Sequence, residues 1–124
     1  MEILRALPDT PILDRTVIAL GNFDGVHRGH QALIARTVQL AREIQGQSVV
    51  LTFDPHPLQL LRPEEPVKLI LTTERKSKRI AQLGADILLL LPFTRELALT
   101  APDDFGTMIF QALRPAVIVV GFNY

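Results

Sequence analysis

The sequence predicts a doubly wound α/β fold with a parallel sheet, and three observations support this prediction. Short apolar runs alternate with longer segments whose apolar residues recur at helical spacing. The first apolar run, residues 17–20, contains no polar positions, which is typical of a parallel strand buried on both faces. The length of 124 residues and the 48% hydrophobic content provide one core and leave no room for a second full domain.

The first half of the chain predicts a strand, a helix and a second strand. The strand of residues 17–20 ends at Gly21, and the helix of residues 28–45 has an apolar face and ends at Gly46. Residues 48–53 form the second strand. The next segment, residues 54–71, is rich in proline and too long for a tight connection, so we interpret it as a binding loop or lid.

The second half predicts two further helices and two further strands. Thr73 caps a helix that ends at Gly84, and residues 86–91 form the third strand. Thr100 caps the last helix, because Asp103 follows three residues later and a proline lies in the first turn. Residues 116–120 form the fourth strand. The last helix carries one apolar stripe that we assign to the core: Phe105, Met108, Ile109, Ala112 and Leu113.

Composition and charge exclude several classes of function. Thirteen basic and thirteen acidic residues cancel, so no overall field attracts nucleic acid or an anionic membrane. The chain has no cysteine, which excludes disulfides and thiolate zinc sites and fits the cytoplasm. No apolar run is long enough to span a membrane. One helix carries four cations, which we interpret as a solvated face: Arg75, Lys76, Lys78 and Arg79.

The turn from Gly21 to His30 joins the first strand to the first helix and carries the chemistry of the sequence. Gly21 and Gly25 permit a tight turn and a close approach of backbone to ligand. His27 and His30 lie near the unpaired N–H groups and the positive dipole end of the helix, which is a place that binds phosphate. Gly29 removes a side chain between the two imidazoles.

Other interpretations of this region stay open. His27 and His30 also fit a zinc site completed by His56 with Asp24 or Asp54, although such a site leaves the glycines unexplained. Asn22 and Asp24 either bind a nucleotide or stabilise the turn through bonds to backbone. Phe23 either lines the site or belongs to the core.

Three ordered blocks of sequence resemble one family. Residues 21–31 contain an HxGH element, residues 52–57 read TFDPHP, and residues 119–124 read VVGFNY. Together they resemble the amino-terminal module of the prokaryotic bifunctional riboflavin kinase/FMN adenylyltransferases. These enzymes belong to the HxGH nucleotidyltransferase superfamily, whose fold is Rossmann-like.

The resemblance implies a reaction, its substrates and its residues. ATP and FMN, with Mg²⁺, would give FAD and pyrophosphate, and His27 and His30 would stabilise the phosphates. ATP would bind at a set of turn residues: Gly21, Asn22, Phe23, Asp24, Gly25 and Gly29. A flavin and phosphate loop would comprise Pro55, His56 and Asn123. No metal ligand is assigned, and neither nucleic acid nor a membrane is expected as a partner.

The end of the sequence departs from the family, so we expect a single domain, residues 1–124, that is incomplete at its C-terminus. The arginine–phenylalanine–glycine stretch, a substrate motif and the riboflavin kinase domain of the family are absent. We therefore expect poor or no activity from this chain alone, and self-association through uncovered surface. The alternatives are another nucleotidyltransferase of the superfamily, or a non-catalytic module that binds nucleotide or metal.

Overall fold

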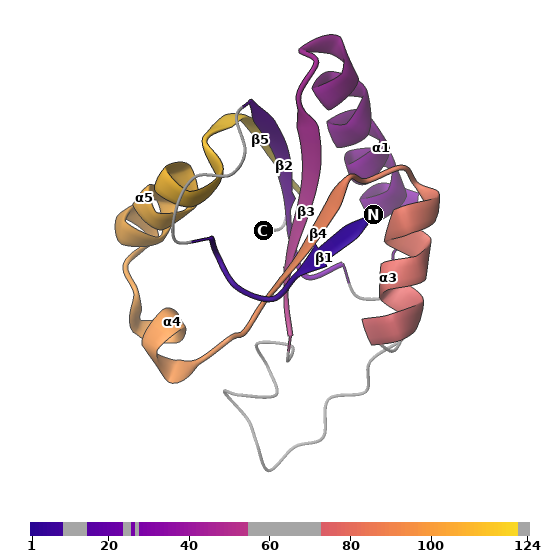
Figure 1. The fold of residues 1–124 in the computed structure, drawn as a ribbon. Coiled ribbons are helices and arrows are strands. Elements are labelled where there is room, and N and C mark those ends of the chain that lie inside the picture. Colours follow the sequence, from indigo (N-terminus) through magenta and orange to yellow (C-terminus); the bar gives the residue numbers. More distant parts are fainter. Residues whose placement is uncertain (9–14, 24–25, 27, 55–72, 122–124) are drawn as a thin grey trace.

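The structure contains one five-stranded sheet in which every pairing is parallel (Figure 1). This computed structural model describes residues 1–8, 15–23, 26, 28–54 and 73–121. The strands have the order β1-β4-β3-β2-β5. Their bounds are Glu2–Leu4 for β1, Thr16–Leu20 for β2, Gln47–Phe53 for β3, Ile87–Leu91 for β4 and Pro115–Val120 for β5.

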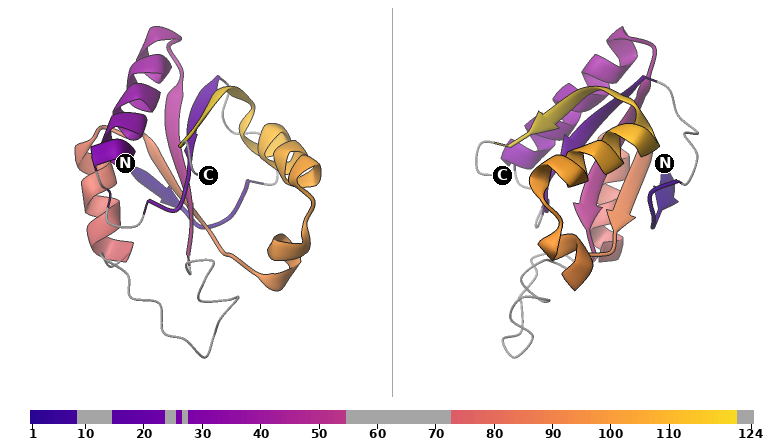
Figure 2. Two further views of the ribbon diagram at one scale, coloured as in Figure 1. Left: turned by 180° about the vertical axis from the view of Figure 1, so that it is seen from behind. Right: turned by 90° about the vertical axis from the view of Figure 1, so that its left-hand side faces the viewer.

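Helices cover both faces of the sheet, which confirms the predicted doubly wound α/β class. The bounds are Arg28–Glu43 for α1, Thr73–Gln82 for α3, Arg95–Leu99 for α4 and Pro102–Leu113 for α5. The views in Figure 1 and Figure 2 agree that α1 and α3 lie on one face and α4 and α5 on the other. The four predicted strands and three predicted helices are confirmed, whereas β1 and α4 were not predicted.

Alternate residues of each central strand supply two separate cores. In β3, Val49 and Leu51 pack with Ile109 of α5, whereas Val50 between them packs with Ile34 of α1. All of these side chains are buried. The division explains why the strands are apolar at every position, because each of the two faces needs its own apolar surface.

The helix ends form where glycine was expected, but for two different reasons. Gly84 follows α3 with φ of +94°, the left-handed conformation that glycine adopts most easily. After α1 it is Gln45 that is left-handed, with φ of 56°. Gly46 is required instead by a close approach, because a Cβ atom there would lie 1.9 Å from the carbonyl oxygen of Arg15.

The start of α5 corrects two predictions. Thr100 does not cap this helix: its hydroxyl donates to the carbonyl of Glu96 at 2.8 Å in α4, and Ala101 is the N-cap residue without a side-chain bond. Pro102 does occupy the first turn. Met108 is 41% exposed, so the apolar stripe is buried only in part. Thr100 is instead the C-cap residue of α4, the short helix that the sequence did not predict.

Strand β5 exposes apolar side chains at one lateral edge of the sheet. It is last in the strand order of the described residues, and Val117, Ile118 and Val120 are 37%, 46% and 51% exposed. Phe110, on the helix that precedes it, is 62% exposed. We call the exposed apolar residues of this strand, Val117, Ile118 and Val120, the apolar edge surface.

Candidate active site

The carboxyl ends of β2 and β5 mark the point where the strand order reverses. From β2 the chain proceeds outward through β3 to β4, and β5 then returns to the opposite side of β2. Ligands of open α/β sheets bind at this kind of switch point. Gly21 follows β2 and Gly121 follows β5, so both glycines lie at the carboxyl ends of strands, as the sequence predicts.

The turn after β2 has a strained backbone that buried side chains hold in place. Phe23 and Val26 have φ of 52° and 45°, a region that residues other than glycine rarely adopt. Both side chains are buried, with exposures of 2% and 1%. Gln31 donates from Nε2 to the Val26 carbonyl at 3.0 Å. Packing in the α1 and α3 core therefore overcomes the local backbone preference.

Gly21 makes room for a side chain of the protein. A Cβ atom at this position would lie 3.1 Å from Cζ of Phe23. The expected close approach is therefore made here by the Phe23 ring. Because that ring is buried, any contact of Phe23 with a ligand would involve its backbone.

His30 lies in the first turn of α1 and is half-buried. Its imidazole meets the Phe23 ring edge to face, with centroids 5.4 Å apart and planes at 78°. A Cβ atom at Gly29 would have no heavy atom of the described residues within 4 Å. The start of the helix therefore has open space at Gly29, one residue before the imidazole of His30.

Asn22 is held by two side chains that reach it from other elements. Its carbonyl oxygen accepts from Thr52 Oγ1 at 2.8 Å and from Lys76 Nζ at 3.0 Å. Its own Oδ1 is buried and has no hydrogen-bond partner among the described residues. Such an atom is costly unless a ligand or water supplies a donor.

Lys76 corrects the interpretation of the basic helix. The residue is only 8% exposed, whereas Arg75, Lys78 and Arg79 are exposed as expected of a solvated face. Sequence analysis missed this position, although one signal was present. Lys76 precedes the buried Ile80 by four residues, so the two share the inner face of α3.

An aromatic cavity of about 340 Å³ opens beside Asn22. Its lining comes from β3, α4, α5 and the segments next to them: Asn22, Phe53, Phe93, Leu97, Thr100, Pro102 and Phe105. The rings of Phe53 and Phe93 meet edge to face at 5.3 Å. The volume and the apolar lining are those of a small-molecule site. The sequence did not predict it, because its rings come from separate elements.

Six of the predicted site residues lie outside the described residues: His27, Asp24, Gly25, Pro55, His56 and Asn123. Their predicted roles stay predictions, and so does the zinc interpretation that involves three of them. Within the described ranges, no group of three or more His, Asp or Glu residues is placed to hold a metal ion. Asp54, also considered as a ligand, forms an ion pair with Arg5 at 3.5 Å.

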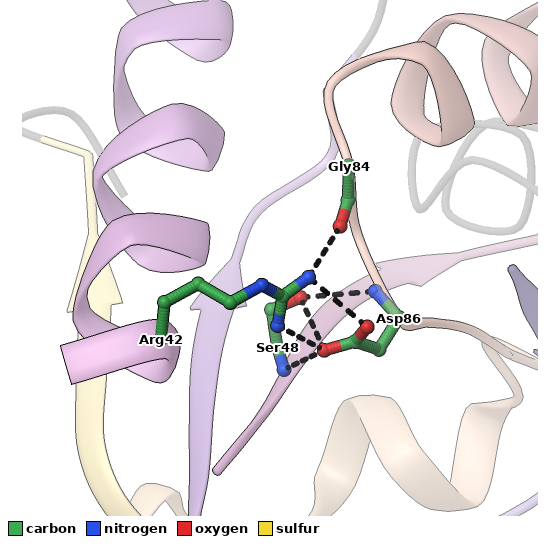
Figure 3. A network of polar contacts seen from close by, with 4 residues as sticks. All are labelled: Arg42, Ser48, Gly84 and Asp86. Atoms are coloured by element: carbon green, nitrogen blue, oxygen red, sulfur yellow. Dashed lines mark hydrogen bonds and ion pairs between the residues drawn. The ribbon is translucent and has the colours of Figure 1, made fainter. Parts of the chain in front are cut away.

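A second polar cluster lies at the opposite, amino-terminal edge of the sheet (Figure 3). Arg42 donates to both carboxylate oxygens of Asp86, at 2.9 and 3.2 Å, and to the Gly84 carbonyl. The backbone N–H and hydroxyl of Ser48 donate to the same carboxylate. Partial burial raises the pKa of Asp86, but the hydrogen bonds from Arg42 and Ser48 outweigh it, so this pKa lies below its ordinary value. We interpret this cluster as a structural link between α1, β3 and β4.

Comparison with known families and proteins gives a consistent result. The family model described as FAD synthetase matches residues 9–124. The chain is 41% identical over 109 residues to the bifunctional riboflavin kinase/FMN adenylyltransferase of Listeria monocytogenes, and 39% identical over 111 residues to that of Bacillus subtilis. These alignments cover 87% and 89% of the chain but 35% of each relative. The chain therefore spans about a third of the length of these proteins.

A solved structure has the same fold. The crystal structure of a Streptococcus pneumoniae protein, described as a macrolide-efflux protein, superimposes with a TM-score of 0.86 at 30% identity. The match covers 98% of this chain and 48% of that one. None of the helices in the described part of our chain has the length and hydropathy of a membrane span.

Proposed function

Because the chain belongs to the FAD synthetase family, we propose that it carries the site for adenylyl transfer from ATP to FMN, which gives FAD and pyrophosphate. The observation that carries this proposal is the arrangement at the switch point. An imidazole and a helix start lie beside the turn after β2, and an aromatic cavity opens next to the same turn. The first feature suits a polyphosphate and the second suits a planar ring.

ATP would bind along the turn and the start of α1. Helix N-termini stabilise anions through unpaired N–H groups and the helix dipole. His30 would donate a hydrogen bond to the triphosphate and to the charge that develops on the departing pyrophosphate. His27 would act beside it. The FMN phosphate is already an anion near neutral pH, so the reaction needs positioning and charge stabilisation more than a strong base.

FMN would place its isoalloxazine ring in the aromatic cavity. Phe53, Phe93 and Phe105 supply apolar surface for a flat ring system. Oδ1 of Asn22, which lacks a partner among the described residues, would accept a hydrogen bond from the flavin or its ribityl chain. Because Asn22 of the turn lines the cavity, a flavin bound there with its ribityl chain toward Asn22 would direct its phosphate to the turn that holds ATP.

Mg²⁺ would arrive with ATP as part of the substrate. The described residues offer no cluster of three carboxylate or imidazole groups for a resident ion. Magnesium sites at nucleotides commonly use one or two protein carboxylates together with substrate phosphates and water. In this proposal the phosphates hold the metal, and residues of the chain position the phosphates.

The test measures binding and turnover separately. Calorimetry of the chain with ATP and Mg²⁺ should detect binding that weakens in His30→Ala and stays unchanged in Arg36→Ala, an exposed control on the same helix. In a full-length relative carrying the matching substitution, FAD formation should fall by roughly 10²–10³. Near-normal turnover would contradict the role of His30. Tight zinc binding without nucleotide binding would favour a metal-binding module instead.

A further inference from the structure

Lys76 is a buried cation directed at the turn that the proposed function assigns to ATP. The residue is 8% exposed, and its Nζ donates to the carbonyl oxygen of Asn22 at 3.0 Å. Burial of an ammonium group is costly unless hydrogen bonds and nearby charge compensate it. A lysine that only solubilises a helix would extend into water, as Lys78 does on the same helix.

The contact joins two elements that are far apart in sequence. Lys76 belongs to the first turn of α3, and Asn22 follows β2. The same carbonyl also accepts from Thr52, a fully buried residue of β3, at 2.8 Å. Two donors from different elements therefore fix the orientation of one peptide group, immediately before the left-handed Phe23.

We propose that Lys76 is a positioning residue for nucleotide binding. It fixes the peptide of Asn22 and so the turn that leads to His30, and its ammonium group adds positive charge behind the part of the turn that faces the phosphates. The proposal rests on the proposed function for its ligand. The part of the proposal that concerns the fixed turn applies to the chain without ligand and can be tested there.

The two donors to the Asn22 carbonyl allow the two effects of Lys76 to be separated. Lys76→Met keeps the length of the side chain but removes both the hydrogen bond and the charge. Thr52→Val removes a hydrogen bond to the same oxygen and leaves the charge in place. Lys78→Met removes an equal charge from the exposed face of α3 and serves as the control.

Binding of ATP with Mg²⁺, measured by calorimetry at two salt concentrations, tests the charge. Lys76→Met should weaken binding by about 10-fold or more, since a hydrogen bond from a charged donor is lost together with its charge. Its binding should also depend less on salt than that of the wild type. Thr52→Val should weaken binding less, and Lys78→Met should leave it unchanged. Lys76→Arg, which keeps charge and donor, should bind better than Lys76→Met.

Amide chemical shifts and hydrogen exchange of the chain without ligand test the fixed turn. Lys76→Met should shift the amides of Gly21, Asn22 and Phe23 and speed their exchange, while the amides of β4 stay as in the wild type. Unchanged turn amides together with unchanged ATP affinity would overturn the proposal. If the wild type fails to bind ATP, the proposed function fails, and the turn amides still decide whether Lys76 positions the turn. If Lys76→Met does not fold, Lys76→Gln removes the charge while it keeps a polar side chain, and Thr52→Val removes the second hydrogen bond to the Asn22 carbonyl, so ATP affinity and the turn amides of these two variants decide the proposal.

Discussion

The ring of Phe23 lies edge to face against the imidazole of His30, with centroids 5.4 Å apart and planes at 78°. Phe23 is buried, and His30 lies half-buried at the helix start. Edge-to-face pairs restrict the orientation of both rings. A core residue therefore orients the side chain to which we assign phosphate binding, and this relationship gives the first prediction.

Phe23→Leu should weaken ATP binding more than a control substitution in the same core does. Leucine keeps an apolar side chain in the core but loses the ring edge that restricts His30. The measurement is ATP affinity by calorimetry alongside urea unfolding. Ile80→Val, at a residue of α3 in the same core cluster, is the control for a loss of core packing alone, with an expected cost of about 0.5–1.5 kcal/mol. Equal ATP affinity in the two variants would contradict the prediction.

Phe105→Ala should weaken FMN binding about 5-fold to 150-fold. Stacking of a flat ring on an aromatic side chain is worth roughly 1–3 kcal/mol when measured by alanine substitution. Flavin fluorescence quenching measures the affinity. Phe110→Ala makes the same chemical change on the same helix at a position that is 62% exposed, and it should leave FMN binding unchanged. Equal losses in both variants would show that the cavity is not the flavin site.

Gly46→Ala should destabilise the fold by about 1–3 kcal/mol or more. The added Cβ atom would lie 1.9 Å from the Arg15 carbonyl oxygen, so backbone has to move. Gly106→Ala is the matched control, because a Cβ atom there meets no described atom within 4 Å in the middle of α5. That variant should stabilise by roughly 0.5–1 kcal/mol. If urea unfolding shows a stability change of the same sign in both variants, Gly46 is not required by a close approach of backbone.

Asp86→Asn should reduce the amount by which the free energy of unfolding falls in acid. The pKa of Asp86 in the folded chain lies below its ordinary value, so its contribution is present above pH about 4 and is lost as pH falls through the folded pKa. Urea unfolding at pH 7 and pH 3 should give a smaller difference for Asp86→Asn than for the wild type. Arg42→Met, which removes the partner, should act in the same direction. The same difference in stability between pH 7 and pH 3 for all three proteins would contradict this prediction.

The apolar edge surface should cause self-association. Unpaired edge strands with apolar side chains pair with a second copy of themselves. Sedimentation velocity should show a weight-average mass that rises with protein concentration. Ile118→Lys, at a residue that is 46% exposed, should abolish the rise, because charge on an edge prevents such pairing. A monomer at every concentration would contradict this expectation.

The order of most elements could be predicted from the sequence because it follows from local patterns. Apolar runs locate β2, β3 and β4, and helix periodicity locates α1. Strand β1 could not be predicted, because Ile3 is 45% exposed and the strand is three residues long. Helix α4 was missed for the same reason, since five residues give no periodicity.

The details of the site depend on contacts that no local pattern encodes. Gly21 was expected to let a ligand approach, yet its free space is occupied by Phe23 from two residues further on. Lys76 of α3 and Thr52 of β3 meet at one carbonyl only because the tertiary fold brings both side chains to the turn after β2. Sequence indicates which residue types can act, and tertiary packing decides which of them meet.

The Arg42–Asp86 cluster and the turn after β2 lie at opposite edges of one sheet, which separates two kinds of evolutionary constraint. Substitutions around Arg42 should alter thermal tolerance without touching ligands. Loops at the other edge can diversify in length and chemistry while the scaffold persists. A library of variants for a new substrate preference would therefore randomise positions around the aromatic cavity. It would leave Ser48 and Asp86 unchanged, because they link elements of the fold.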